Sequence, residues 1–292
     1  MIIAIVGPTG VGKTKLSIEL AKKYQAEIIN GDSTQIYRDI NIGTAKVTEE
    51  EAQGIKHHLI DICDLDEEYT VYHYQKDARQ IIEQLQAENK NIIICGGSGL
   101  YLSALLYDYK FVAESNIYDF DSLTDQEMYD ALTNLGVKID KKNRQRLIRA
   151  YAKYINNSAP IDSNMGGSNL IYNAIIIGLT TDRETLHHRI NKRVDLMIES
   201  GLIQEVKEVF NKYPDSKELR TAIDYKEFMP YLNNEVYLEE VLIKIKQNSR
   251  QYAKRQYTWL NHKMDVKWFD VNFDNFNETI KEVIKYINGK DN

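Results

Sequence analysis

Cysteine is scarce in this sequence. Only Cys63 and Cys95 occur among 292 residues, and each lies inside an apolar run. Two cysteines in such positions give little support to a disulfide or to a cysteine-ligated zinc site. We therefore expect both thiols to be reduced and to lie in the core.

The sequence also lacks a basic leader and any apolar run that approaches the length of a membrane span. A helix that crosses a bilayer needs about 20 mostly apolar residues. The hydrophobic and charged fractions, 43% and 27%, are close to those of globular proteins. We expect a cytoplasmic protein with no membrane partner and, by default, a monomer.

Charge is unevenly distributed around a net value of −6. Residues 138–154 carry seven basic side chains against one acidic one, and residues 241–263 carry six basic side chains and no acidic one. Either segment alone is more typical of a solvated helix face. Two of them in an otherwise acidic chain that also has a phosphate-binding motif favour a nucleic acid partner.

Short apolar strands alternate with helical patterns along most of the chain. Strands are predicted at 2–6, 27–30, 59–62, 91–95 and 173–179, and helices at 13–24, 74–88, 99–107 and 183–200. This alternation predicts an α/β fold, a P-loop NTPase-like parallel sheet flanked by helices. Right-handed crossovers would bring the loops after the strands to one edge of the sheet.

The alternation breaks between residues 110 and 170. A polar, acidic stretch at 116–140 is followed by a basic helical pattern at 143–155 and a loop at 156–169. We predict a catalytic core formed by 1–112 and 171–292, with helices in its C-terminal part, and a small helical insertion at 113–170.

The strand at 2–6 leads into a complete phosphate-binding loop, Gly7-Pro8-Thr9-Gly10-Val11-Gly12-Lys13-Thr14. It matches G-x-x-x-x-G-K-[ST] between a strand and a helix, which is the context that this motif requires. Backbone N–H groups and the helix N-terminus would surround a phosphate. Lys13 would contact the terminal phosphates, and the Thr14 hydroxyl could hold Mg²⁺.

The acid that supports Mg²⁺ in an ATPase or GTPase is poorly represented. Asp61 is a weak candidate, because it lies between Ile60 and Ile62 after two histidines. The strand at 91–95 runs into Gly96-Gly97-Ser98-Gly99 with no acid, and no Asn-Lys-x-Asp guanine motif occurs. The chain is therefore poorly equipped for nucleotide hydrolysis.

A different acid, Asp32, follows the second predicted strand. It would lie across the mouth of the pocket from the phosphates, a suitable place for a general base. An isolated Asp at such a position is more often a helix cap or a turn residue, so both interpretations stay open here.

With this segment the sequence resembles a family, the tRNA dimethylallyltransferases or tRNA isopentenyltransferases. The blocks that carry the resemblance occur in the family's order across essentially the whole chain. They are the phosphate-binding loop, Asp32-Ser33-Thr34-Gln35-Ile36-Tyr37, Ile42-Gly43-Thr44-Ala45-Lys46, His57-His58-Leu59-Ile60-Asp61, Gly96-Gly97-Ser98-Gly99-Leu100-Tyr101, Asp182-Arg183, Arg193-Val194-Asp195 with Met197, Tyr225-Lys226-Glu227, and Arg250-Gln251-Tyr252-Ala253-Lys254-Arg255-Gln256 with Thr258-Trp259.

The resemblance implies transfer of a dimethylallyl group from its diphosphate to N6 of the adenosine 3′ to the anticodon of tRNA. Residues 7–14 would then hold a departing diphosphate with Mg²⁺ on Thr14, and Lys13, Asp32 and Ser98 would be catalytic. Residues implied to contact the tRNA anticodon stem-loop are Asp32, Ser33, Thr34, Gln35, Ser98, Gln145, Arg146, Leu147, Ile148, Arg149, Arg250, Lys254 and Arg255.

The sequence departs from the family pattern at several positions. Ser98 replaces Thr and keeps the hydroxyl, Asp224 replaces a Gly, and Thr221 replaces a Gln or Arg. Ala152 replaces a Glu, and the insertion is shorter than is usual for the family. Asp224 is tolerable, but strained, if its backbone requires a positive φ.

Two other functions remain open from the sequence. A small-molecule kinase on a P-loop fold would use Arg144, Arg146 and Arg149 as an arginine-rich lid. A diverged, weakly active or non-catalytic RNA-binding paralogue would bind tRNA with a steep salt dependence. The latter would not need Lys13, Thr14 or Asp32.

Overall fold

The structure, a computed structural model, describes residues 1–111, 123–137, 139–141, 144–155 and 167–290. They belong to two compact units, Met1–Tyr107 with Leu170–Asn292, and Asp108–Asn169. None of the helices in the described ranges combines the length and the apolar character that a bilayer crossing requires.

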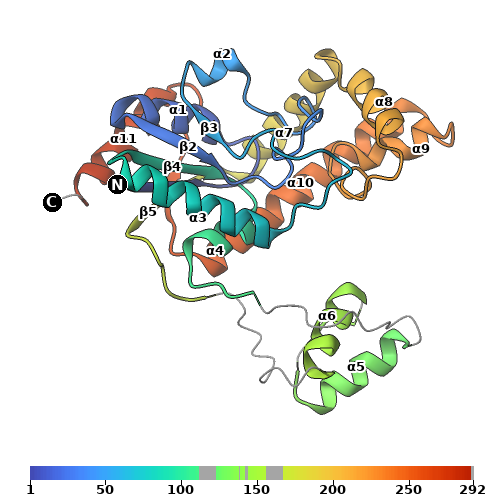
Figure 1. The fold of residues 1–292 in the computed structure, drawn as a ribbon. Coiled ribbons are helices and arrows are strands. Elements are labelled where there is room, and N and C mark those ends of the chain that lie inside the picture. The colour runs from blue at the N-terminus through green and yellow to red at the C-terminus, as the bar shows by residue number, and fades with distance from the viewer. Residues whose placement is uncertain (112–122, 138, 142–143, 156–166, 291–292) are drawn as a thin grey trace. The chain divides into compact units, whose positions relative to one another are not determined.

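The larger unit is built on a six-stranded parallel sheet (Figure 1). The strand order is β3-β2-β4-β1-β5-β6. The strands are β1 (Ile2–Val6), β2 (Ala26–Asn30), β3 (His57–His58), β4 (Asn91–Gly96), β5 (Ala174–Thr180) and β6 (Lys267–Asp270). The predicted α/β fold is confirmed.

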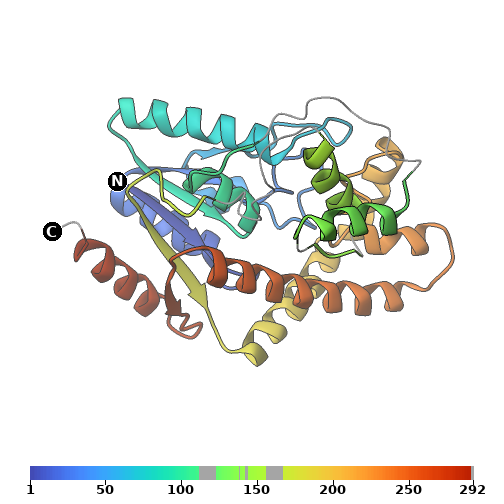
Figure 2. The ribbon, with the colours of Figure 1, turned by 90° about the horizontal axis from the view of Figure 1, so that it is seen from below.

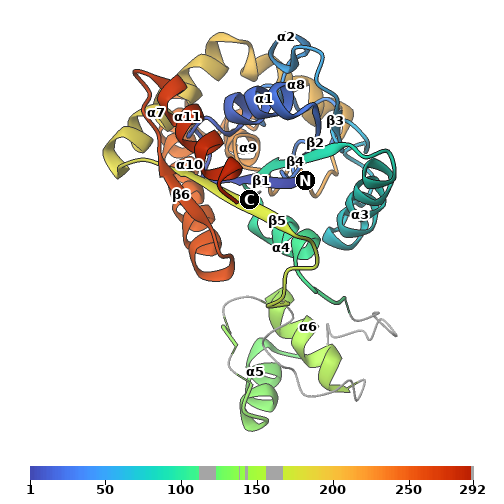
Figure 3. The same ribbon diagram turned by 90° about the vertical axis from the view of Figure 1, so that its left-hand side faces the viewer.

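Helices cover both faces of this sheet. The helices of this unit are α1 (Lys13–Tyr24), α2 (Glu49–Ala52), α3 (Val71–Ala87), α4 (Gly99–Leu106), α7 (Arg183–Glu199), α8 (Leu202–Lys212), α9 (Met229–Leu232), α10 (Leu238–Lys263) and α11 (Phe276–Asn288), with a 3₁₀ turn η1 (Lys226–Phe228). Figure 2 shows the length of α10, and Figure 3 shows α1 and α11 on one side of the sheet and α4 on the other.

The central strand β1 explains why two layers of helices are needed. All five of its residues are buried. Because side chains alternate along a strand, Ile3 and Ile5 join the apolar cluster of α1 and α11, whereas Ile2, Ala4 and Val6 join that of α3, α4 and α10. A wholly apolar strand thus requires cover on both faces.

The strand predicted at 59–62 is wrong. Strand β3 ends at His58, and the backbone then takes positive φ values at Leu59 (60°) and Asp61 (55°). Such left-handed residues cannot continue an extended ladder. The carbonyl oxygen of Leu59 instead accepts a hydrogen bond of 2.9 Å from the Asn30 side chain.

A sixth strand was not predicted. The apolar–aromatic piece near 266–269 forms β6, which pairs with β5 in parallel register. Gly178 of β5 pairs with Trp268, and a Cβ atom on this glycine would lie 2.4 Å from the indole ring. Only glycine leaves room for the Trp268 ring to pack against the neighbouring strand.

The smaller unit contains α5 (Asp125–Asn134) and α6 (Arg144–Ile155). Thr124 and Glu127 form a capping box at the start of α5. Its core consists of Met128, Leu132, Leu147 and Ala150. These four side chains come from both helices, so the pair buries an apolar core of its own.

Candidate active site

The phosphate-binding loop connects β1 to α1 and leaves the start of that helix open. Gly12, the N-cap of α1, has a φ of 93°, and neither a side-chain cap nor an acidic residue occupies the first turn. Such a position favours glycine, and a Cβ atom here would also lie 2.8 Å from the Phe276 ring. The first N–H groups of α1 and the positive end of its dipole are therefore available to an anion.

Lys13 begins α1 and lies within this loop. Its ammonium donates a hydrogen bond of 2.8 Å to the Pro8 carbonyl oxygen. Burial of the ammonium lowers the pKa of Lys13 to about 8, with nearby Arg193 acting in the same direction and Asp32 opposing it. A bound diphosphate would supply the counter-charge that this ammonium lacks.

Three loops converge at the carboxyl edge of the sheet around a cavity of about 390 Å³. The phosphate-binding loop contributes Thr9, Lys13 and Thr14. The loop after β2 contributes residues 32–35 and 43–45, and β4 contributes residues 95–96. The remaining wall comes from α7, α10 and residues 218–226. The phosphate-binding loop and the loop that carries Asp32 thus face one space, as the parallel topology predicts.

Asp32 is a turn residue, one of the two interpretations that the sequence left open, and it also lines the cavity. Its Oδ1 accepts hydrogen bonds from the Thr34 amide (3.0 Å) and hydroxyl (2.8 Å), as in a turn. The Asn30 side chain accepts from the Asp32 amide at 3.0 Å and so fixes the backbone. Oδ2 of Asp32 has no hydrogen bond to any other described residue, and Asp32 lines the cavity. One carboxylate oxygen therefore orients the group, and the other is available to a substrate.

Ser98 joins two of the loops instead of lining the cavity. Its Oγ accepts a hydrogen bond of 3.0 Å from the Ser33 amide and donates one of 3.2 Å to the Ser33 hydroxyl. The side chain is buried, and Ser33 is part of the cavity wall. Ser98 therefore holds the segment that carries Asp32.

Gln256 of α10 is a site residue that the sequence reasoning missed. Its Oε1 accepts a hydrogen bond of 2.9 Å from the Thr9 amide, and its Nε2 donates one of 3.1 Å to the Gly97 carbonyl oxygen. Gln256 is buried and lines the cavity. Its presence in a block shared with the family was the only signal, because no local pattern shows which loops a glutamine will bridge.

Two arginines of α7 were missed as well. Arg193 donates a hydrogen bond of 2.7 Å to the Thr9 hydroxyl and lines the cavity, and Arg189 donates one of 2.9 Å to the Gly10 carbonyl oxygen. Burial lowers the pKa of Arg193, while Asp224 and Asp32 oppose the shift. The guanidinium stays charged, so it adds positive potential beside the phosphate-binding loop.

Asp224 does occupy a backbone that requires a positive φ, with a value of 74°. Its Oδ1 accepts a hydrogen bond of 2.9 Å from the Ser249 hydroxyl, and its amide donates one of 3.0 Å to Glu227. Burial raises the pKa of Asp224 to about 6, although nearby Arg193 opposes the shift. The replacement of glycine therefore places a titratable carboxyl in the cavity wall.

The residues implied to contact tRNA occupy different environments. On α10, Lys254 and Arg255 are exposed, and Arg255 also lines the cavity. The Arg250 guanidinium on the same helix donates a hydrogen bond of 2.6 Å to Asn191. Gln35 lines the cavity too, and the Thr221 hydroxyl is within hydrogen-bond distance of the carbonyl oxygens one turn earlier.

On α6, Arg146 is exposed and Ile148 is half-buried. Leu147 is fully buried against α5, where it supports the helix and is not available to a ligand. The side chains of Gln145 and Arg149 lie outside the described residues.

The phosphate end of the cavity suits Mg²⁺ by its chemistry. Among the described residues, no group of three His, Cys, Asp or Glu side chains could hold a metal ion. The Thr14 hydroxyl lines the cavity, and hard oxygen donors are the ligands that Mg²⁺ prefers. Such an ion would be held by Thr14, water and the phosphate oxygens of a ligand together.

Comparison with known proteins gives a consistent family. A family model described as IPP transferase matches residues 35–263. A curated tRNA dimethylallyltransferase from Macrococcus caseolyticus is 41% identical over 303 aligned positions, covering 100% of this chain and 97% of the relative. The crystal structure of tRNA delta(2)-isopentenylpyrophosphate transferase from Staphylococcus epidermidis superposes with a TM-score of 0.76 at 37% identity, covering 99% of each chain. A eukaryotic dimethylallyltransferase acting on tRNA superposes with a TM-score of 0.81 at 30% identity, covering 92% of this chain and 73% of that one.

The lowered pKa of Lys13 predicts how diphosphate binding depends on pH. Because only the protonated ammonium attracts an anion, the affinity for inorganic diphosphate should weaken above pH 8, by up to about tenfold per pH unit. A Lys13→Arg variant, whose guanidinium stays protonated, serves as the control for changes in the ligand itself. Calorimetric titrations from pH 7 to pH 10 check this. An affinity ratio between the two proteins that does not change with pH would contradict it.

The raised pKa of Asp224 predicts how stability depends on pH. The folded protein holds this proton more tightly than the unfolded chain, whose Asp has an ordinary pKa of 3.8. The resulting stabilisation is present below about pH 4 and is lost as the pH rises through about 6. Relative to the Asp224→Asn variant, the wild type should therefore lose about 2 kcal/mol of unfolding free energy between pH 4 and pH 7. Urea denaturation at several pH values measures it, and a constant difference would show that the pKa is not raised.

Proposed function

The chain belongs to the IPP transferase family, and from this premise we propose that it transfers a dimethylallyl group from dimethylallyl diphosphate to tRNA. The acceptor that we propose is the exocyclic N6 of the adenosine 3′ to the anticodon. One observation carries the reaction: the phosphate-binding groups and the available oxygen of Asp32 open into the same cavity. We expect a cytoplasmic monomer.

The phosphate end of the cavity would stabilise the leaving group. As the allylic C–O bond breaks, its electron pair passes to the diphosphate, and negative charge builds on the oxygens that face Lys13 and the start of α1. Lys13, Arg193 and the N–H groups of α1 interact more strongly with that charge than with the ground state, which lowers the barrier. Where Mg²⁺ is bound at Thr14, it would add charge neutralisation at the same oxygens.

The opposite end of the cavity would accept the proton. N6 of the adenosine forms a bond to the allylic carbon that loses the diphosphate, and the nitrogen must then lose a hydrogen. Oδ2 of Asp32 is the group that we propose takes it, because Oδ1 is occupied by Thr34. The products are the prenylated tRNA, free diphosphate and one proton.

A base inside a stem-loop can reach this cavity only by leaving its stack. Exposed Lys254 and Arg255 of α10 would contact the phosphate backbone of the tRNA beside the cavity mouth. Arg146 of the insertion is exposed too and would contact the tRNA backbone. We propose no contact for Leu147, since it is buried. Because such contacts are electrostatic, the affinity for tRNA should fall as the salt concentration rises.

A small-molecule kinase is the alternative with which this proposal competes. A kinase needs an acidic residue that supports Mg²⁺, and Asp61 is the candidate for that role. Asp61 forms an ion pair of 2.5 Å with Lys46, and its backbone is in the left-handed conformation. Asp61 thus has a structural partner of its own, which disfavours the kinase interpretation.

The direct test is incubation with labelled dimethylallyl diphosphate and unmodified tRNA. The wild type should label tRNA that carries adenosine next to the anticodon and should not turn over ATP. Asp32→Asn keeps an oxygen for the Thr34 hydrogen bonds but removes the base, and the transfer rate should fall about 10²- to 10⁴-fold. Asp64→Asn, which removes an exposed ion pair with Arg38, is the matched control. No transfer by the wild type to any such tRNA would overturn the proposal.

A further inference from the structure

The cavity wall includes a long irregular loop that needs support. Residues 31–46 contain neither a helix nor a ladder strand, yet Asp32 and Gln35 at one end and residues 43–45 at the other line the cavity. A loop of this length keeps a single conformation only where other groups fix its backbone. Two charged side chains do so here, from opposite sides.

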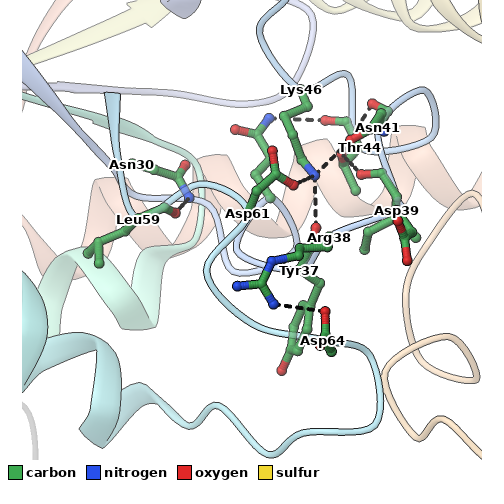
Figure 4. A network of polar contacts seen from close by, with 12 residues as sticks. Asn30, Tyr37, Arg38, Asp39, Asn41, Thr44, Lys46, Leu59, Asp61 and Asp64 are labelled. Carbon is green, nitrogen blue, oxygen red and sulfur yellow. Dashed lines mark hydrogen bonds and ion pairs between the residues drawn. The ribbon is translucent and has the colours of Figure 1, made fainter. Parts of the chain in front are cut away.

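Lys46 supports the loop from inside (Figure 4). Its ammonium donates hydrogen bonds to the Tyr37 carbonyl oxygen (2.8 Å), Asn41 Oδ1 (2.9 Å) and Asp61 Oδ1 (2.5 Å). These three bonds use all of its donors, and the side chain is only 4% exposed. The conformation of residues 37–46 is therefore fixed around one buried cation.

Glu205 of α8 supports the same loop from outside. Its carboxylate accepts hydrogen bonds from three consecutive backbone N–H groups, those of Asn41 (2.9 Å), Ile42 (2.8 Å) and Gly43 (3.1 Å). Successive N–H groups that point to one place form an anion-binding concavity. A carboxylate from another element fills it, so the bend of the loop depends on that charge.

Tyr225 completes this arrangement. Its hydroxyl donates a hydrogen bond of 2.6 Å to Glu205 and accepts one of 3.1 Å from the Gly43 amide. A Cβ atom on Gly43 would lie 2.6 Å from the Tyr225 ring, so the loop can pack here only through a glycine. Tyr225 follows Asp224 in the opposite wall of the cavity, and the contact thus joins the two walls.

The far end of the loop in turn positions a cavity residue. The side-chain Nε2 of Gln35 donates hydrogen bonds to the backbone carbonyl oxygens of Thr44 (3.1 Å) and Ala45 (3.3 Å). These two bonds fix the side-chain amide of Gln35, and Gln35 lines the cavity beside Asp32. Any shift of residues 41–45 moves this side chain.

We propose that Glu205, together with Tyr225, is a positioning residue for the tRNA substrate. This inference rests on the proposed function. The carboxylate fixes residues 41–45 and, through them, Gln35 at the end of the cavity that receives the base. The diphosphate site on Lys13 and α1 does not depend on it. Loss of Glu205 should therefore affect the two substrates unequally.

The test is steady-state kinetics of the full chain with the Glu205→Gln variant. The amide keeps the size of the side chain but presents a donor to backbone N–H groups. We expect kcat/KM for tRNA to fall about 10- to 100-fold, as for other small misplacements of reacting groups. The KM for dimethylallyl diphosphate should stay close to that of the wild type. Glu208→Gln, on the exposed side of α8, removes the same charge without this contact and serves as the control.

A second variant, Tyr225→Phe, keeps the ring against Gly43 and removes only the hydroxyl. It should reduce kcat/KM for tRNA in the same direction, and the double variant should be no worse than Glu205→Gln alone. Wild-type activity in Glu205→Gln would overturn this inference. A loss of affinity for dimethylallyl diphosphate as large as the loss of kcat/KM for tRNA would also overturn it, because it would indicate a purely structural role for Glu205. A wild type that transfers nothing to tRNA would instead contradict the proposed function.

Discussion

The site depends on the close approach of α10 to the carboxyl edge of the sheet. Gln256 of this helix bridges the Thr9 amide and the Gly97 carbonyl oxygen, and so joins the phosphate-binding loop to the loop after β4. Cβ atoms on Gly97 and Gly99 would lie 2.2 Å from Gln256 and Trp259 respectively, so the helix can reach this position only over glycines. The glycine-rich segment after β4 is thus a contact surface for a helix.

Charge is distributed in the cavity in a way that suits a departing anion. Lys13 and Arg193 are both buried enough to lower their pKa values, and an incoming diphosphate would relieve that cost. Asp224 and Asp32 partly balance the charge of the two cations. The same cations then act on charge that grows during the reaction, which explains why a phosphate-binding loop can serve transfer of an allyl group without nucleotide hydrolysis.

Local patterns predicted four of the six strands, the main flanking helices and the phosphate-binding loop, because hydrophobic periodicity and the loop motif are properties of contiguous residues. They failed at 59–62, where Leu59 and Asp61 take left-handed conformations that tertiary contacts with Asn30 and Lys46 support. They could not reveal Gln256 or Glu205 either. The backbone groups that both side chains bind lie more than 150 residues away, and no spacing rule connects them.

The central claim is that this cavity transfers a prenyl group to the adenosine next to the anticodon. Mass spectrometry of tRNA nucleosides from cells that lack this protein, complemented with the wild type or with Asp32→Asn, tests it most directly. We expect N6-dimethylallyladenosine at that position with the wild type, and a large loss with the variant and in the uncomplemented cells. Equal amounts of the modified nucleoside in all three strains would contradict it.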